Sequence, residues 1–357
     1  MIAPETTFPS GTRAAILGCA GLTLSPDERA FFQREKPYGF ILFARNVGSP
    51  DQVRDLVTEM RGTVGWQAPV LIDQEGGRVQ RMTRPHWRKY PNGAIFGTLY
   101  ERDPGRAERL CRLNAHLLAS DLAELGIDVD CLPLLDLPQP GAHDVIGARA
   151  FSADIAPTIA LAQAQVAGLA DAGVTGVIKH IPGHGRAMAD SHLDLPRIDT
   201  PLETLEAHDF PPFTAFADAP YGMTAHLLLT ALDAERPSTT SNVVIEGVIR
   251  GTIGFKGLLM TDDLSMNALG GTLGERAAAS IAAGCDLVLH CNGNMTEMEP
   301  VMAHVPELNG GAADRARRAD ALRFEVHAKG QSAPSGTAEQ LAEALGASWP
   351  DTEGRHA

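Results

Sequence analysis

Residues 174–185 read Val174-Thr175-Gly176-Val177-Ile178-Lys179-His180-Ile181-Pro182-Gly183-His184-Gly185. The run from Val174 to Lys179 is short and mostly apolar, as expected for a strand that is buried on both faces. From Lys179 onward, titratable side chains alternate with glycine and proline, which disfavour a regular helix or strand. A buried strand that runs into an irregular loop of titratable groups is typical of an active site.

The same kind of apolar run recurs along the chain and alternates with amphipathic stretches, which is the pattern of βα units. Eight such units predict an α/β fold of the (β/α)8 TIM-barrel type. A doubly wound sheet is the alternative, but its GxGxxG fingerprint is missing after the early strands. The expected strands are Ala14–Leu17, Gly39–Phe43, Val70–Ile72, Val129–Leu132, Val174–Lys179, Gly222–Thr224, Leu258–Thr261 and Leu287–His290.

Helix signals lie between these strands. Ser25 and Ser49 each precede a proline, so both are expected as N-caps with proline in the first turn. Further helices are expected at Pro104–Leu125, Ala156–Ala172, Ser241–Arg250 and Glu275–Ala283. We expect one catalytic barrel over residues 1–310, followed over 311–357 by a helical extension with a flexible tail. That extension would contain helices at Ala313–Val326 and Thr337–Leu345.

Composition limits the possible functions. The chain has 357 residues and a net charge of −14, which argues against nucleic-acid binding because that needs a basic face. No segment reaches the ~20 apolar residues of a membrane helix. The five cysteines are odd in number and none are in CxxC spacing, so a reduced, cytoplasmic compartment is expected. We expect a monomer.

Polar residues follow the expected strands in a repeated position. Asp73 ends the third strand, Lys179 and His180 end the fifth, His226 follows the sixth, and the Asp262-Asp263 pair ends the seventh. In a barrel, these ends meet at one face, where functional residues gather.

Several of these segments together resemble the family 3 glycoside hydrolases, specifically the single-domain β-N-acetylhexosaminidases of bacterial cell-wall recycling. The resemblance covers about residues 13 to 300 in the correct order. The matching segments are 39–46 (GFILFARN), 73–79 (DQEGGRV), 179–185 (KHIPGHG), 190–192 (DSH) and 261–266 (TDDLSM).

The resemblance implies a retaining exo-β-N-acetylglucosaminidase that acts on GlcNAc-1,6-anhydroMurNAc muropeptides. Asp262 would be the nucleophile, as a carboxylate that forms a glycosyl-enzyme intermediate. Asp263 is expected to cap a helix that begins before Leu264. His192, oriented by Asp190, would be the acid/base group, and the ordinary pKa of histidine near ~6.5 suits that role.

The family's substrate-contacting positions correspond to six further residues, and the resemblance implies no metal and no organic cofactor. Lys179 also calls for a partner on physical grounds, because it ends an apolar strand. Two segments depart from the family's usual text, at Arg186-Ala187 and at Ala148, and either change could alter how the loops are anchored. Five of them are Asp73, Arg81, Arg149, Lys179 and His180. The sixth is His226, for which a ring bound within the protein is as much expected as a direct sugar contact.

Other functions are considered alongside this one. A zinc-dependent hydrolase could use His180, His184, His192 and Asp190 as ligands, but it leaves Asp262 and Asp73 without a role. A sugar-binding barrel that has lost activity is disfavoured by the intact acidic residues. A β-glucosidase of the same family normally has a second domain, for which this chain is too short. A β-N-acetylglucosaminide phosphorylase could have the same dyad.

Overall fold

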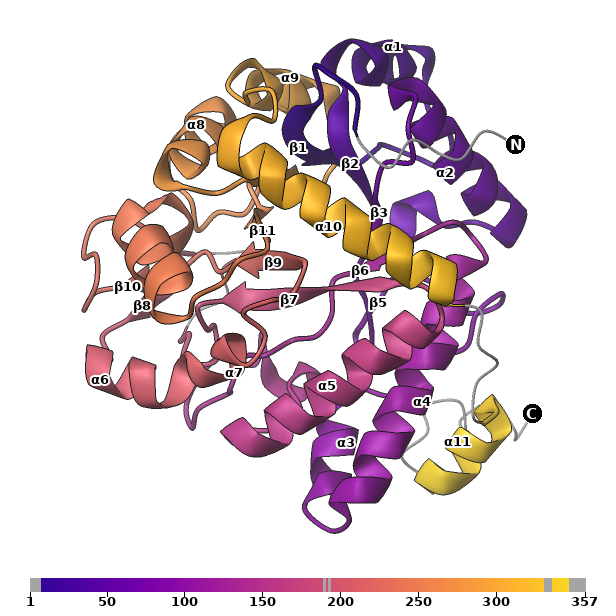
Figure 1. Cartoon of the computed structure of the whole chain (residues 1–357), viewed down its shortest axis with the longest axis vertical. Helices are drawn as coiled ribbons and strands as arrows, with labels where there is room; N and C mark the ends of the chain where they lie inside the picture. Colours follow the sequence, from indigo (N-terminus) through magenta and orange to yellow (C-terminus); the bar gives the residue numbers. More distant parts are fainter. Residues whose placement is uncertain (1–7, 189–190, 192–193, 331–335, 347–357) are drawn as a thin grey trace.

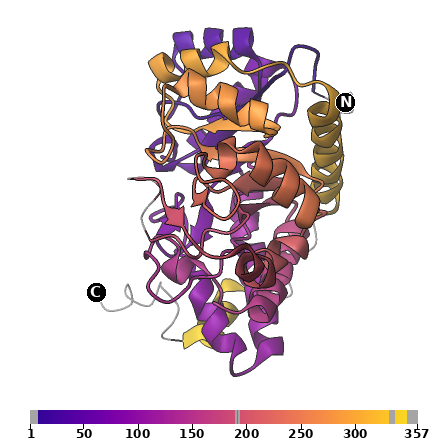
Figure 2. The same ribbon diagram turned by 90° about the vertical axis from the view of Figure 1, so that its left-hand side faces the viewer.

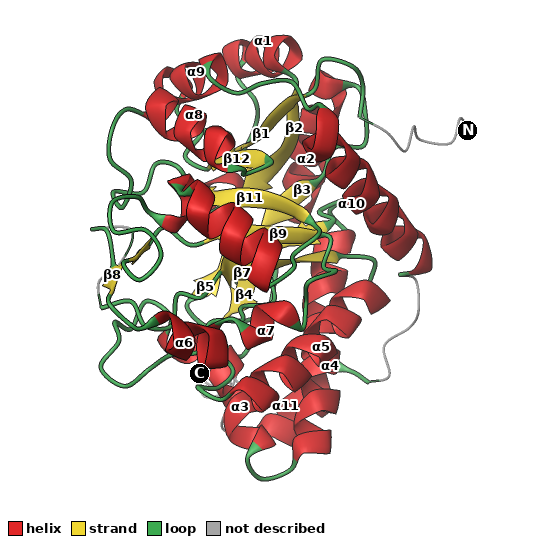
Figure 3. Ribbon diagram, turned by 60° about the vertical axis from the view of Figure 1, so that its left-hand side comes forward, coloured by secondary structure: helices red, strands yellow, loops and turns green. Residues whose placement is uncertain are grey.

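The computed structural model describes residues 8–188, 191, 194–330 and 336–346. Eight parallel strands close into a barrel in the order β1-β12-β11-β9-β7-β6-β3-β2, with helices outside it (Figures 1 and 3). This is the predicted (β/α)8 barrel. The strands are β1 (Arg13–Leu17), β2 (Pro37–Leu42), β3 (Val70–Ile72), β6 (Val129–Asp130), β7 (Thr175–Ile181), β9 (Tyr221–Thr224), β11 (Leu258–Asp263) and β12 (Leu287–His290).

Each of these strands overlaps one of the expected apolar runs. The runs could be identified because barrel strands are covered on both faces, so nearly every residue is apolar. All six residues of β2 and all four of β9 and β12 are buried. Two short additional sheets lie outside the barrel: β4 (Gln74–Gly76) pairs with β5 (Val79–Gln80), and β8 (Arg197–Ile198) pairs with β10 (Leu228–Leu229).

The helices begin where capping chemistry predicts. Ser25 accepts a hydrogen bond from the Glu28 N–H while Glu28 accepts one from the Ser25 N–H, and Ser49 and Gln52 repeat this box. The expected helix at Ser241–Arg250 is present but is wound as the π-helix η5 (Val243–Thr252). The longer α-helices are α1 (Pro26–Glu35), α2 (Pro50–Val64), α3 (Gly93–Tyr100), α4 (Pro104–Ala123), α5 (Ile155–Asp171), α8 (Leu273–Ala283), α9 (Met295–Ala303), α10 (Gly310–Lys329) and α11 (Ala338–Leu345). Shorter helical turns are η1 (Ala44–Asn46), η2 (Gly147–Arg149), α6 (Leu202–Thr204), η3 (Leu205–Asp209), α7 (Pro211–Thr214) and η4 (Ser238–Thr240).

Helix α10 crosses the amino-terminal end of the barrel (Figure 1). Its fully buried Arg323 donates hydrogen bonds to Asp128, just before β6, and to the Gln67 carbonyl, before β3. Nearby, the Tyr38 hydroxyl at the start of β2 donates to Asp320 at 3.0 Å. Figure 2 shows α10 along one side of the molecule, away from the side where most loops lie. The carboxyl ends of the strands therefore open on the face opposite α10.

Within the described ranges, none of the helices combines the length and the apolar composition that crossing a bilayer requires.

Candidate active site

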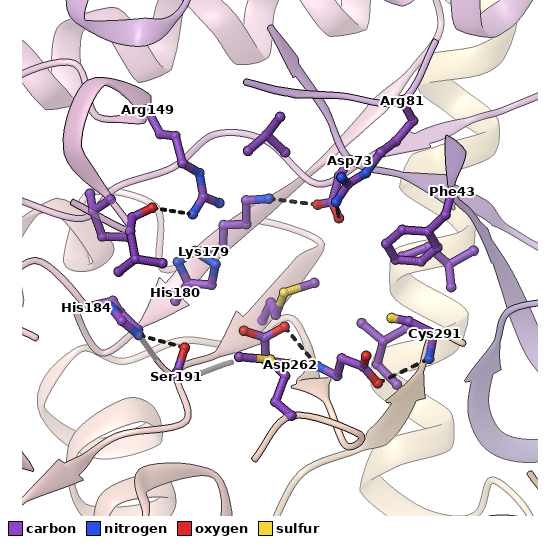
Figure 4. Close-up of a pocket in the computed structure, with 18 residues that line it drawn as sticks. Phe43, Asp73, Arg81, Arg149, Lys179, His180, His184, Ser191, Asp262 and Cys291 are labelled. Carbon is purple, nitrogen blue, oxygen red and sulfur yellow. Dashed lines mark hydrogen bonds and ion pairs between the residues drawn. The ribbon is translucent and has the colours of Figure 1, made fainter. Parts of the chain in front are cut away.

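A cavity of about 290 Å³ opens at the carboxyl ends of the strands, where a TIM barrel carries its active site (Figure 4). Six of the residues predicted from the sequence meet there from distant parts of the chain, namely Asp73, Arg81, Arg149, Lys179, His180 and Asp262. Its titratable lining includes Asp73, Arg81, Arg149, Lys179, His180, His184, Asp262 and Asp263. We call the ion-paired part of this lining the charged wall; the lining also includes the apolar side chains Phe43, Met223, Met266 and Leu289.

A network of ion pairs forms the charged wall. The Lys179 ammonium lies 2.9 Å from Asp73 Oδ1 and 2.6 Å from Glu75 Oε1. Arg149 binds Glu75 with two hydrogen bonds, of 2.8 Å from Nε and 2.7 Å from Nη2. Arg81 Nη2 donates to Asp73 Oδ2 at 3.0 Å. The buried Lys179 therefore has the partners that its place at a strand end requires.

These contacts fix the charge states. Burial by itself would raise the pKa of Asp73 and Glu75, but Lys179 and the neighbouring arginines outweigh it. The pKa of Asp73 lies below its ordinary value, and that of Glu75 is lowered to about 2. Burial would likewise lower the pKa of Lys179, yet the two carboxylates raise it. All three groups are ionised near neutral pH.

A turn positions Arg149, and a contact with an aromatic ring positions Arg81. Arg149 is the last residue of η2, which is a short 3-10 helix, and its Nη1 donates to the Val145 carbonyl at 3.0 Å. The Arg81 guanidinium lies 5.0 Å from the centre of the Phe43 ring, a cation–π contact. The predicted sugar-contacting arginines are therefore positioned by the protein itself. Alanine at position 148 leaves the η2 turn intact.

Asp262 lies at the end of β11 and is half-buried in the cavity wall. Its Oδ1 accepts a hydrogen bond of 2.8 Å from the Asp263 N–H. Burial opposes ionisation, but the positive charge that His180 and His226 can bear, together with this hydrogen bond, keeps the pKa of Asp262 below its ordinary value. Asp262 is thus an ionised carboxylate that faces the cavity, which is the state that a nucleophile requires.

Asp263 caps a turn rather than a helix, so the expected helix N-cap is wrong. Its carboxylate accepts from the Ser265 N–H at 3.1 Å, the Ser265 hydroxyl at 2.6 Å and the Cys291 N–H at 3.2 Å. The next helix, α8, begins only at Leu273. An Asp-x-Ser sequence can cap a turn as well as a helix, and here a turn follows the strand.

Sequence reasoning missed Asp136. It is fully buried and its carboxylate accepts from the His180 ring at 2.7 Å, from the His180 N–H at 3.3 Å and from the His184 N–H at 2.6 Å. Asp136 therefore fixes both the ring of His180 and the turn at His184. A signal did exist: Asp136 follows strand β6 in Leu134-Leu135-Asp136, as Asp73 follows β3.

His184 also lines the cavity but is held neutral, because burial lowers its pKa to about 4. Its Nε2 lies 3.3 Å from the hydroxyl of Ser191, which is another lining residue. Asp190 and His192, the predicted acid/base dyad, lie outside the described residues. Arg186 precedes them and is bound to Asp209 in η3 by contacts of 2.9 and 2.8 Å from Nε to the two carboxylate oxygens.

His226 is placed differently from the other predicted sugar contacts. It is fully buried and is not among the described residues that line the cavity. Its Nδ1 lies 2.7 Å from the Thr239 hydroxyl, and its Nε2 lies 3.1 Å from the Asp263 carbonyl oxygen. Both ring nitrogens are therefore engaged within the protein.

The described residues contain no group of three His, Cys, Asp or Glu side chains placed to hold a metal ion. The zinc site considered from the sequence includes Asp190 and His192, which are outside this part of the chain.

The chain is similar to known proteins over most of its length. The family model "Glycosyl hydrolase family 3 N terminal domain" matches residues 19–319. A beta-hexosaminidase of Alkalilimnicola ehrlichii is 39% identical over 296 residues, covering 82% of this chain and 84% of that protein. NagZ from Neisseria gonorrhoeae, solved with N-trifluoroacetyl-D-glucosamine, has a TM-score of 0.78 and 30% identity, covering 89% of this chain and 98% of NagZ. A β-N-acetylglucosaminidase from Paenibacillus sp. FPU-7 has a TM-score of 0.80 and 30% identity, covering 93% and 66% of the two chains.

Proposed function

We propose that this chain, which belongs to glycosyl hydrolase family 3 and is a β-hexosaminidase, releases terminal β-linked N-acetylglucosamine with retention of configuration. The observation that carries the proposal is the ionised Asp262 in the cavity wall, together with the fixed Asp73–Lys179 pair in the same cavity. In the proposed reaction, Asp262 attacks the anomeric carbon and the aglycone leaves. Water then hydrolyses the ester between the sugar and Asp262, which releases N-acetylglucosamine and restores the carboxylate.

We assign sugar binding to the charged wall. Asp73 accepts from sugar hydroxyls, while Arg81, Arg149, Lys179 and His180 donate to hydroxyl and acetamido oxygens. Their ion pairs already hold these side chains in place, so little reorganisation accompanies binding. The ring of His180 is fixed by Asp136, which leaves its Nε2 free to face the ligand.

We assign proton transfer to His192, with Asp190 as its orienting carboxylate. Ser191, which stands between them in the sequence, is among the residues that line the cavity, and this supports the assignment. A histidine acid/base suits a hydrolase that works near neutral pH, because its ordinary pKa is near ~6.5.

We propose GlcNAc-1,6-anhydroMurNAc muropeptides as the natural substrates and the cytoplasm as the compartment, in cell-wall recycling. The resemblance of the motifs to the recycling enzymes supports this assignment. The ligand of the Neisseria NagZ structure is a glucosamine derivative, which is consistent with a glucosamine-type sugar in the corresponding cavity here.

The nucleophile is tested by trapping. A 5-fluoro N-acetylglucosaminyl donor should form an ester that mass spectrometry locates on the peptide containing Asp262. Asp262→Asn should lower turnover of 4-nitrophenyl β-N-acetylglucosaminide by about 10⁴-fold or more, because it removes the nucleophile. Asp144→Asn, at an exposed ion pair, serves as the control and should keep wild-type turnover.

Two results would contradict the proposal. One is an adduct on another residue, and the other is near-wild-type activity of Asp262→Asn. Turnover that depends on added inorganic phosphate, with a sugar phosphate as the product, would instead identify a phosphorylase.

A further inference from the structure

His226 lies two residues beyond β9, at the carboxyl end of the barrel, close to the end of β11. The sequence left open whether it contacts sugar or is bound within the protein; its side chain is fully buried and both ring nitrogens have protein partners. We propose that His226 is a positioning residue that acts on the nucleophile Asp262 through the backbone of Asp263. This inference rests on the proposed function, in which Asp262 attacks the sugar.

The proton positions on the ring follow from its partners. A carbonyl oxygen carries no proton, so the nitrogen that faces the Asp263 carbonyl at 3.1 Å must be the donor. Burial lowers the pKa of His226, which favours the neutral ring. Nδ1 then accepts from the Thr239 hydroxyl at 2.7 Å. Thr239 is itself held by the Thr224 hydroxyl at 2.7 Å, so the ring is fixed from the barrel wall.

Near Asp262, the backbone of β11 is paired with β12 on one side but no longer with β9 on the other. Strand β11 pairs with β9 only as far as Met260 opposite Met223, whereas its pairing with β12 continues to Asp263 opposite Leu289. On the β12 side, the Leu264 N–H also donates to the Leu289 carbonyl at 2.9 Å. On the β9 side, the His226 side chain continues the contact beyond the last paired residue.

This contact reaches the reacting group in two steps. His226 holds the carbonyl of Asp263, and the N–H of Asp263 donates to Asp262 Oδ1 at 2.8 Å. Rotation of residue 263 would therefore move the donor that orients the attacking carboxylate. A displacement of about 1 Å from the attack geometry can cost about 100-fold in rate.

Two amide variants separate the ring nitrogens. In His226→Gln the side-chain NH₂ can take the place of Nε2 and still donate to the Asp263 carbonyl. In His226→Asn the amide reaches only as far as Nδ1, so the contact with Thr239 can persist while the donor to Asp263 is lost. We expect His226→Asn to lower kcat on 4-nitrophenyl β-N-acetylglucosaminide by about 10- to 100-fold, and His226→Gln to recover most of it.

A second measurement distinguishes positioning from sugar binding. The Kd of N-acetylglucosamine, measured by calorimetry, should stay within about twofold of wild type in both variants, since no sugar contact is removed. A similar increase of that Kd in both variants would identify His226 as a sugar ligand and overturn the inference. Wild-type kcat in His226→Asn would overturn it as well.

Two variants of Thr239, the hydrogen-bond partner of His226, test the inference if His226→Asn does not fold. Thr239→Val removes the hydroxyl that holds Nδ1 and should lower kcat without changing the Kd of N-acetylglucosamine, while Thr239→Ser should restore kcat. Equal kcat in the two Thr239 variants would count against the inference. Failure of the proposed function is distinct, because it appears as turnover by Asp262→Asn with His226 intact.

Discussion

At the scale of single residues, Glu75 matters although it does not belong to the described lining of the cavity. Its carboxylate joins Lys179 and Arg149 and lies within the wall rather than on its surface. Replacing Glu75 with Gln removes the carboxylate partner of Arg149 and leaves Lys179 with Asp73 alone, and removing one partner of a buried ion pair is costly.

We therefore expect Glu75→Gln to lower kcat/KM on 4-nitrophenyl β-N-acetylglucosaminide, mainly by raising KM. Hydrogen bonds to charged groups contribute about 1.5–3 kcal/mol each, so the loss should be roughly ten- to hundredfold. Steady-state kinetics measure the effect. Glu297→Gln, in the first turn of α9, is the control, and an equal loss in both variants would argue against a specific role for Glu75.

The sequence predicted functional residues at strand ends, but it did not reveal the buried residues that hold them in position. Asp73, Lys179 and Asp262 each follow an apolar strand, and the structure brings them to one cavity. Asp136 sits in an apolar segment with prolines on both sides, which reads as core packing. The pairing of His226 with Thr239 joins two loops and leaves no pattern in the sequence.

At the scale of elements, the loop after β7 begins with two fixed points. The backbone of His184 is bound to Asp136, and Arg186 is bound to the nearly buried Asp209. Gly185 lies between them, where a Cβ atom would come within 1.9 Å of the Leu137 carbonyl oxygen. The beginning of this loop is therefore tightly specified by packing.

We predict that Arg186→Ala harms substrates with poor leaving groups more than activated ones. The proposed acid/base dyad follows Arg186 in the same loop, and only poor leaving groups need a proton in order to depart. Turnover of a β-linked disaccharide should fall about tenfold more than turnover of 4-nitrophenyl β-N-acetylglucosaminide. Arg197→Ala, at an exposed ion pair later in the loop, should affect both equally little. Proportional losses for the two substrates in Arg186→Ala would contradict the prediction.

Element types were predictable where local chemistry decides them. Serine followed by proline fixed the starts of α1 and α2, and apolar runs fixed the strands. The two-residue strands β5, β8 and β10 form only because tertiary packing brings their partners close. The π-helical winding of η5 likewise has no counterpart in its helical sequence pattern.

At the scale of the whole molecule, Arg323 joins α10 to the amino-terminal end of the barrel. Its guanidinium is fully buried between Asp128 and Asp320, both of them also buried. Removing one partner of such a group leaves uncompensated buried charge and typically costs about 3–5 kcal/mol.

We expect Arg323→Met to lower the free energy of unfolding by about 3–5 kcal/mol, measured by urea denaturation. Adding Asp320→Asn should recover part of the loss, because Asp320 is the carboxylate that loses its ion-pair partner, whereas Asp128 keeps Arg61. Arg317→Met changes an exposed arginine of the same helix and should alter stability by no more than about 0.5 kcal/mol. A small effect of Arg323→Met would show that water or another cation replaces the guanidinium.

Because α10 comes late in the chain, this contact can form only near the end of synthesis. Tyr38 and Asp128 are made early, but their partners on α10 leave the ribosome only after every barrel strand has been translated. Until then, Tyr38 lacks its hydrogen-bond acceptor on α10, and Asp128 has Arg61 but not Arg323 as a cation. A premature stop shortly before Gly310 would thus yield a chain with every barrel strand and the whole catalytic face, yet without the helix and the guanidinium that cover the amino-terminal end of the barrel.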